Sequence, residues 1–213
     1  MARLRVHNFA MSLDGFAAGT DQSQESPLGL GGESLHPWIF ATRTGRAMLG
    51  EEGGSEGVND DFVRAGEDGI GATIMGRNMF GPVRGPWPDI SWRGWWGENP
   101  PFHHPVYVMT HHARPDVQMA GGTVFRFIDA APREVLAMAV DAAGGLDVRL
   151  GGGVSTVRAF LAEGLVDEMH LAIAPVFLGD GERLFGDGVP PEGYASDPLV
   201  VGDGIAHAVI RRA

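Results

Sequence analysis

Residues 146–164 read LDVRLGGGVSTVRAFLAEG, and this stretch decides the fold. Its first five residues alternate apolar and polar side chains, which predicts a strand that runs directly into three glycines. Residues 155–163 then place apolar side chains at helical spacing, and Gly164 marks the end of that helix. A strand, a glycine turn and a helix in this order are typical of an α/β sheet.

The three glycines also indicate a ligand site. The first N–H groups of a helix have no partner inside it and lie at its positive end. Glycines before such a helix let a pyrophosphate approach closely, and Ser155 and Thr156 add hydroxyl donors. The spacing is not GxGxxG, and a chain with 33 glycines also builds many plain turns. Phosphate binding and a purely structural turn are therefore both open.

Further strands and helices alternate on both sides of this stretch. Strands are predicted at 4–11, 72–75, 106–110, 123–128 and 169–177, the last being the longest, and helices at 59–67 and 132–143. Asn59-Asp60-Asp61 supplies an N-cap for the first helix, and residues 199–210 indicate a hairpin around Asp203-Gly204.

These elements predict a single domain over residues 1–213. We expect a central, mostly parallel mixed sheet flanked by helices, with a C-terminal antiparallel hairpin. Two irregular insertions interrupt it, at about 17–57 and 81–105. The first contains one short predicted helix near 42–49, and a loop of this length commonly covers a site.

Composition excludes several functions. All 16 basic side chains are arginine, so the chain has neither the lysine of a Schiff base or Walker A motif nor a cysteine nucleophile. The net charge of −11 argues against a nucleic-acid partner. No apolar run approaches the ~18 residues of a membrane span, so we expect a cytoplasmic protein without a membrane partner.

A second phosphate-binding candidate is Gly76-Arg77-Asn78, at the end of its own predicted strand. Arg77 can pair with a phosphate through its planar fork. His111, His112 and Arg114 follow another strand and would complete a basic island that suits NADP better than NAD. The alternative is that these arginines are solvated surface groups.

Candidate proton donors are Asp14, Asp60 and Asp61. Asp14 can equally form a turn and Asp60 can equally cap a helix. Adjacent histidines on a strand point to opposite faces, so the pairs at 103–104 and 111–112 do not predict a metal site. Four tryptophans between 87 and 96 form either a core plug or an aromatic wall for a flat heterocycle.

These motifs together resemble the dihydrofolate reductase superfamily. The resemblance covers about residues 3–186, and its later part is similar to the RibD C-terminal reductase branch. It is carried in order by MSLDG at 11–15, MGRN at 75–78, VYVMT at 106–110, LGGG at 150–153, GLVDE at 164–168, Ala174-Pro175, GDG at 179–181 and Leu184-Phe185.

The resemblance implies NADPH bound across the carboxyl edge of the sheet, and hydride transfer to a C=N or C=O of a small heterocycle. It implies a homodimer and a mobile lid over residues 14–32. The acid of such reductases starts the helix before the Met-Gly-Arg strand, which corresponds to Asp60, with Asp61 beside it. The cofactor residues implied are Phe9 and Ala10 at the nicotinamide, Gly76, Arg77, Asn78 and Met79 at the adenosine phosphates, Thr110 and His111 at the adenine, and Gly152, Gly153, Val154, Ser155 and Thr156 at the pyrophosphate.

The substrate stays open between a pterin or folate and a riboflavin-pathway pyrimidine. Phe16 stands where pyrimidine reductases of that pathway commonly carry lysine, and Leu150 where they often carry glutamate. Two other classes also remain open. One is an NADP(H)-binding sensor or scaffold without turnover, and the other is a flavin-dependent oxidoreductase.

Overall fold

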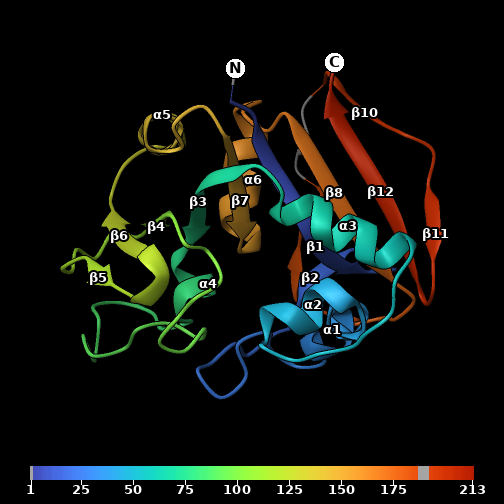
Figure 1. Cartoon of the computed structure of the whole chain (residues 1–213), viewed down its shortest axis with the longest axis horizontal. Helices are drawn as coiled ribbons and strands as arrows, with labels where there is room; N and C mark the ends of the chain where they lie inside the picture. Colours follow the sequence, from blue (N-terminus) through green and yellow to red (C-terminus); the bar gives the residue numbers. More distant parts are fainter. Residues whose placement is uncertain (1, 187–191) are drawn as a thin grey trace.

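The computed structural model describes residues 2–186 and 192–213, and it confirms the α/β fold (Figure 1). Within them, ten strands form one mixed sheet in the order β10-β12-β8-β1-β7-β3-β4-β6-β5, with β11 paired to β12. The parallel centre contains β8 (Glu168–Ala174), β1 (Leu4–Ser12), β7 (Asp147–Gly152), β3 (Ile70–Gly76), β4 (Pro105–Met109) and β6 (Val124–Ile128). The antiparallel edges are β12 (Ile205–Arg212), β10 (Tyr194–Ser196), β11 (Val200–Gly202) and β5 (Val117–Gln118).

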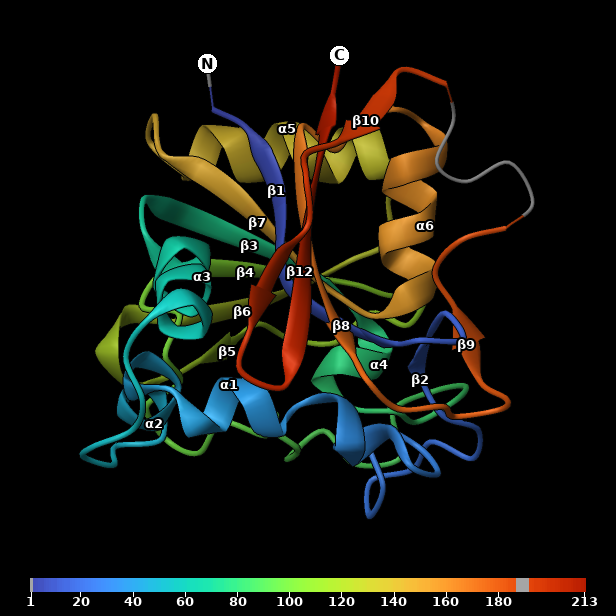
Figure 2. The same ribbon diagram turned by 90° about the vertical axis from the view of Figure 1, so that its right-hand side faces the viewer.

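Helices cover both faces of the sheet, as predicted (Figure 2). On one face lie α5 (Pro132–Ala142) and α6 (Val154–Ala162), and α6 buries Val157, Phe160 and Leu161 in the main core. On the other face, α3 (Val58–Glu67) packs against β1. The β11–β12 pair forms the predicted C-terminal hairpin.

The first insertion is more structured than predicted. It contains β2 (Phe16–Ala18), the 3-10 helix η1 (Gly32–Leu35), α1 (Pro37–Ala41) and α2 (Arg43–Met48), and β2 pairs with β9 (Glu182–Arg183). The predicted short helix near 42–49 is confirmed as α2, whereas the prediction that the rest of this insertion is irregular is wrong. These helices have four to six residues, too few for a periodic apolar pattern, and they are anchored by the buried side chains of Leu35 and Trp38.

Two predicted boundaries are also wrong. Helix α3 begins at Val58 behind Gly57, so Asn59 and Asp60 lie inside the helix and bond to other segments. Strand β8 ends at Ala174, because Pro175 has no N–H for the sheet, and β1 with nine residues is longer.

The second insertion follows α4 (Arg77–Phe80), and between Phe80 and Pro105 the structure contains no helix or strand, as predicted. Two of its indoles satisfy free carbonyl groups at the end of α4. Trp95 donates to the Met79 carbonyl at 3.0 Å, and Trp92 donates to the Phe80 carbonyl at 2.9 Å. Trp87, Trp92 and Trp96 pack on a core around Phe80 and Phe125. These three tryptophans therefore plug the core, and none of the four lines a pocket that the structure describes.

The remaining short element is η2 (Ala120–Gly122). In the part of the chain that the structure describes, no helix has the length and apolar character to cross a membrane.

Candidate functional site

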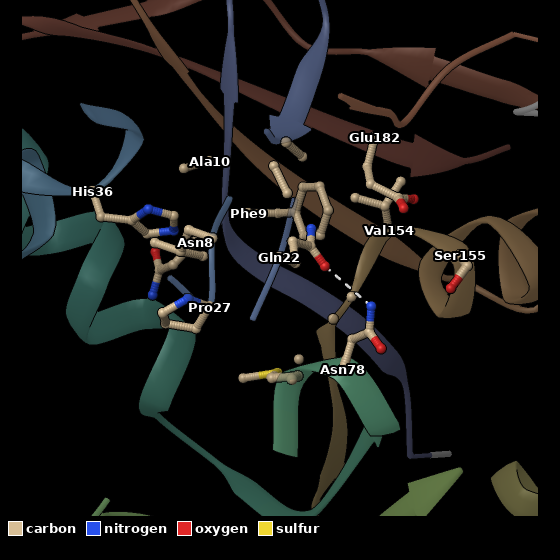
Figure 3. Close-up of a pocket in the computed structure, with 17 residues that line it drawn as sticks. Asn8, Phe9, Ala10, Gln22, Pro27, His36, Asn78, Val154, Ser155 and Glu182 are labelled. Atoms are coloured by element: carbon tan, nitrogen blue, oxygen red, sulfur yellow. Dashed lines mark hydrogen bonds between the residues drawn. The ribbon is translucent and has the colours of Figure 1, made fainter. Parts of the chain in front are cut away.

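A cavity of about 170 Å³ opens where β1 passes the end of β7. Its walls are the middle of β1 around Phe9 and Ala10, the glycines at 151–153, and Met79 of α4. The first insertion closes it from outside with Gln22, Pro27 and Leu28 (Figure 3). A mostly apolar lining with a few polar groups is typical of a small-molecule site.

A second, wider groove of about 420 Å³ continues from this cavity. It follows the carboxyl ends of β3, β4 and β6, from Gly76 past Thr110 to Asp129. Asn78, Gly153 and Ser155 line both spaces, so the cavity and the groove adjoin at these residues, and the two together are called the channel. The carboxyl edge of an open α/β sheet is the usual place for a nucleotide.

The start of α6 forms the junction of cavity and groove. Gly153 caps this nine-residue helix without a side-chain bond, and the N–H groups of residues 154–156 have no acceptor among the described residues. They lie at the positive end of the helix, which attracts phosphate. The glycine run predicted from the sequence therefore lies where an anion could be held.

Two glycines allow this junction to form. Gly76 lies so close to α6 that a Cβ there would stand 2.1 Å from Thr156 Oγ1. Gly152 has a φ of 137°, in the region that favours glycine. Because these two residues have no side chain, the backbones of β3 and β7 can lie directly against the start of α6.

Arg77 lines the groove, as predicted. Its guanidinium lies 4.0 Å from the centre of the Trp87 ring and donates to the Gly85 carbonyl. Its Nε and Nη2 have no hydrogen-bond partner among the described residues, and burial, with Arg114 and Arg84 nearby, lowers its pKa. An anion in the groove would satisfy these free donors.

Arg114 does not line the groove, so its predicted place in the phosphate grip is wrong. It donates to the carbonyls of Ile90 and Trp92 and lies over the Phe127 ring at 4.7 Å. The sequence could not reveal these hydrogen bonds, because Ile90 and Trp92 belong to the irregular second insertion. Arg84 of that insertion lines the groove instead.

The predicted cofactor residues come together. All of the residues named for the cofactor line the cavity, the groove or both: Phe9, Ala10, Gly76, Arg77, Asn78, Met79, Thr110, His111, Gly152, Gly153, Val154, Ser155 and Thr156. The first insertion covers the junction, where the Asn78 amide donates to Gln22 Oε1 at 3.0 Å (Figure 3).

The three candidate proton donors do not join them, since none of the aspartates lines the cavity. The Ser12 hydroxyl and the N–H groups of Leu178 and Gly179 bond to Asp14 and hold its pKa at about 2. Asp61 is exposed and pairs with Arg64 at 2.6 Å. Each therefore has a local structural partner outside the cavity.

Asp60 is buried and accepts the Thr44 N–H at 2.7 Å, which satisfies a free donor at the start of α2. Burial would raise its pKa, but the Thr44 hydrogen bonds, with Arg64 and Arg43, lower it. The carboxylate thus holds α2 on α3.

We expect Asp60→Ala to lower the free energy of unfolding by about 1–2 kcal/mol, because alanine cannot accept the Thr44 N–H. NADPH affinity should change less than twofold, because the cavity does not contain this residue. Urea unfolding and a binding titration would check both values. A large loss of affinity in a fully folded variant would contradict the structural role.

Two functional candidates of the cavity were missed from the sequence, His36 and Glu182. His36 precedes α1 in the irregular first insertion, and Glu182 begins the two-residue strand β9. Neither lies in a periodic pattern or a recognisable motif. Burial lowers the pKa of His36, and the Gly32 carbonyl opposes that shift.

Comparison with solved structures defines the class of fold. A protein from Shewanella sp. PV-4 assigned to riboflavin biosynthesis is 22% identical, with a TM-score of 0.64 over 100% of this chain and 99% of that one. Dihydrofolate reductase from Enterococcus faecalis, complexed with NADP(H), is 14% identical, with a TM-score of 0.52 over 99% and 96% of the two chains. The fold is therefore that of the dihydrofolate reductase class.

The family follows from the sequence profile of the RibD C-terminal domain, which matches residues 5–194. The chain belongs to this family. A further relative, YyaP of Bacillus subtilis strain 168, is 51% identical over 43 residues, a stretch that spans 20% of this chain and 23% of that protein. Family and fold together support a reductase of the riboflavin-pathway type.

Proposed function

We propose that this protein binds NADPH along the channel and reduces a C=N or C=O bond of a small heterocycle. The observation that carries the proposal is that the cavity and the groove adjoin at Asn78, Gly153 and Ser155. One extended cofactor, with a flat ring at one end and phosphates further along, matches this shape. The E. faecalis reductase of the same fold was solved with NADP(H).

The residues present suit each part of such a cofactor. The N–H groups at the start of α6, with the Ser155 and Thr156 hydroxyls, would hold the pyrophosphate. The unpartnered donors of Arg77 and the exposed imidazole of His111 would meet the adenosine end, and the extra phosphate of NADPH would pair with Arg77. The flat ring would lie in the cavity against Phe9 and Ala10.

When bound, NADPH supplies a hydride for the substrate carbon. The chain's own contribution is to orient the ring and to exclude water from the reacting atoms. Phe9, Met79 and Val154 provide apolar walls, while Gln22 and Leu28 close the cavity from the first insertion. A pterin or a pyrimidine of the riboflavin pathway fits the class of substrate.

A titration of the protein with NADPH, followed by tryptophan fluorescence and calorimetry, tests this proposal. We expect saturable binding, and NADPH oxidation with at least one member of a panel of pterins and aminopyrimidines. Absence of binding at millimolar NADPH, with the protein folded, would overturn the proposal. Binding without oxidation across the panel would indicate a sensor or scaffold.

Arg77→Ala should weaken NADPH binding about tenfold to a hundredfold and change NADH binding much less, because an Arg–phosphate pair contributes about 1.5–3 kcal/mol. The affinities of both cofactors would be measured by calorimetry. Arg43→Ala is the matched control, since Arg43 lies on α2 and pairs with Glu56 on the surface. An unchanged ratio of NADPH to NADH affinity in Arg77→Ala would rule out this assignment.

A further inference from the structure

The cavity has two distinct ends. The residues it shares with the groove, Asn78, Gly153 and Ser155, mark the end at which a cofactor would enter. Asn8, Pro27 and His36 lie together at the opposite side (Figure 3). If the proposed function holds, on which this inference rests, that far end is where the substrate must meet the cofactor ring.

Reduction of a C=N or C=O bond needs a proton as well as a hydride. Among the described residues that line the cavity, the titratable side chains are His36 and Glu182. Glu182 lies beside Val154 and Ser155, near the cofactor end, whereas His36 points toward Asn8 and Ala10 (Figure 3). Since the three aspartates lie elsewhere, His36 is the group at the substrate end that can carry a proton.

The surroundings of His36 fix its ring. Pro37 begins α1 directly after His36, and the Gly32 carbonyl lies beside the imidazole, whose Nδ1 is buried. The side chain nevertheless lines the cavity, so its accessible edge is the one that carries Nε2. Glu33 of η1 is exposed, and Glu182 lies across the cavity. The elements packed against η1 and α1 also carry His170 on β8, Arg43 and Arg46 on α2, and Asp60 and Arg64 on α3.

Asn8 supports the same assignment. Its amide nitrogen donates to the Val63 carbonyl at 3.3 Å, while its Oδ1 is buried without a partner. Asn8 Oδ1 is therefore an unsatisfied buried side-chain acceptor among the described residues that line this cavity. Unsatisfied buried polar atoms are uncommon, and one that lines a cavity is typical of a place where a polar ligand binds.

We propose that His36 contacts the substrate and protonates the heteroatom of the bond that is reduced. The substrate carbon gains the hydride, the π electron pair of the double bond moves to the nitrogen or oxygen, and that atom takes the proton from His36 Nε2. Solvent then returns a proton to the imidazole. Substrate and NADPH plus one proton thus become reduced substrate and NADP+.

Nuclear magnetic resonance of the histidine rings tests the placement without turnover. The wild-type protein, His36→Gln and His103→Gln would be labelled with 15N-histidine and titrated with NADP+. His103 lies on neither cavity nor groove, so it is the matched control. We expect NADP+ to shift the signals that His36→Gln removes and to leave those of His103 in place.

Kinetics with the first panel compound that the wild type reduces tests the chemistry. We expect His36→Gln to lower kcat about a hundredfold or more with little change in NADPH affinity, as for other lost proton donors. Wild-type kcat should fall as pH rises, because the protonated imidazole is the donor, and this dependence should vanish in His36→Gln. His103→Gln should retain wild-type kinetics.

The outcomes separate the two proposals. Failure of NADP+ to bind the folded wild type would overturn the proposed function and this inference with it. Binding of NADP+ without any shift of the His36 signals would overturn the inference and leave the cofactor proposal standing. Turnover by His36→Gln with the wild-type kcat and pH profile would likewise overturn the role of His36 and leave the cofactor proposal standing.

Discussion

Gly76→Ala is expected to lower NADPH affinity about a hundredfold and the free energy of unfolding by about 1–3 kcal/mol, the usual range for overpacking. A Cβ at this position would lie 2.1 Å from Thr156 Oγ1 and 3.3 Å from the Gly153 nitrogen. The start of α6 must then move away from β3, which displaces the N–H groups that would hold the pyrophosphate. Calorimetric titration and urea unfolding measure the two effects.

A double variant isolates this contact. Thr156→Ala removes the atom that a residue-76 Cβ would meet first, so Gly76→Ala should destabilise the Thr156→Ala protein less than the wild type. Gly153→Ala is a useful contrast, because its Cβ meets nothing within 4 Å and its φ is −73°. It should keep most of the stability while its methyl group weakens NADPH binding. Equal losses for Gly76→Ala in both backgrounds would contradict the proposed contact.

Acidification from pH 7.5 to 5.5 is expected to lower the free energy of unfolding by about 3 kcal/mol, through two buried histidines. His170 Nδ1 accepts the Asn8 N–H at 3.1 Å, and its Nε2 lies 3.0 Å from His207 Nδ1. His207 Nε2 in turn lies 2.9 Å from Asn59 Oδ1. Because Asn8 can only donate and Asn59 Oδ1 can only accept, both rings are neutral and their tautomers are fixed.

Burial is the main reason that the pKa of each ring lies below its usual value, and for His170 the neighbouring His7 and His207 add to it. The unfolded chain therefore binds protons more readily than the folded one below about pH 6.5. The contribution of the two histidines to the free energy of unfolding is complete above that pH and is lost as the pH falls below it. Between pH 7.5 and 5.5 each ring contributes about 1.4 kcal/mol, so the pair contributes about 3 kcal/mol. His104, whose pKa burial lowers to about 4, adds in the same direction.

Urea unfolding at the two pH values measures this loss. His207→Gln removes one titrating ring and should reduce the loss between pH 7.5 and 5.5 by about 1.4 kcal/mol. His103→Gln, at an exposed position, should leave it unchanged. Equal unfolding free energies at pH 7.5 and 5.5 in the wild type would show that the pair is not held neutral.

The elements of the sheet could be predicted because their signals are local. Apolar alternation at β1 and β3 and the strand–glycine–helix stretch around Gly151–Gly153 each determine the fold within a few residues. The short helix α1 could not be predicted, since it depends on tertiary anchors such as Trp38. The same holds for β2 and β9, which pair across more than 160 residues of chain.

The same distinction between local signals and distant contacts explains which residues of the site could be predicted. The predicted cofactor residues follow strand ends, and the carboxyl ends of parallel strands meet at one edge, so sequence position was sufficient to bring them together. The role of a carboxylate depends on its distant partner: Asp60 bonds to Thr44, and Asp14 to residues 178 and 179. His36 carries no local signal, because only the folded first insertion brings it to Asn8.

The most direct test of the central claim is a crystal structure of the protein grown with NADP+. We expect the pyrophosphate at the N–H groups of residues 154–156, the adenosine phosphate at Arg77, and the nicotinamide ring in the cavity beside Phe9 and Ala10. A cofactor bound elsewhere on the surface, with the channel from Asn8 to Thr110 empty, would contradict it.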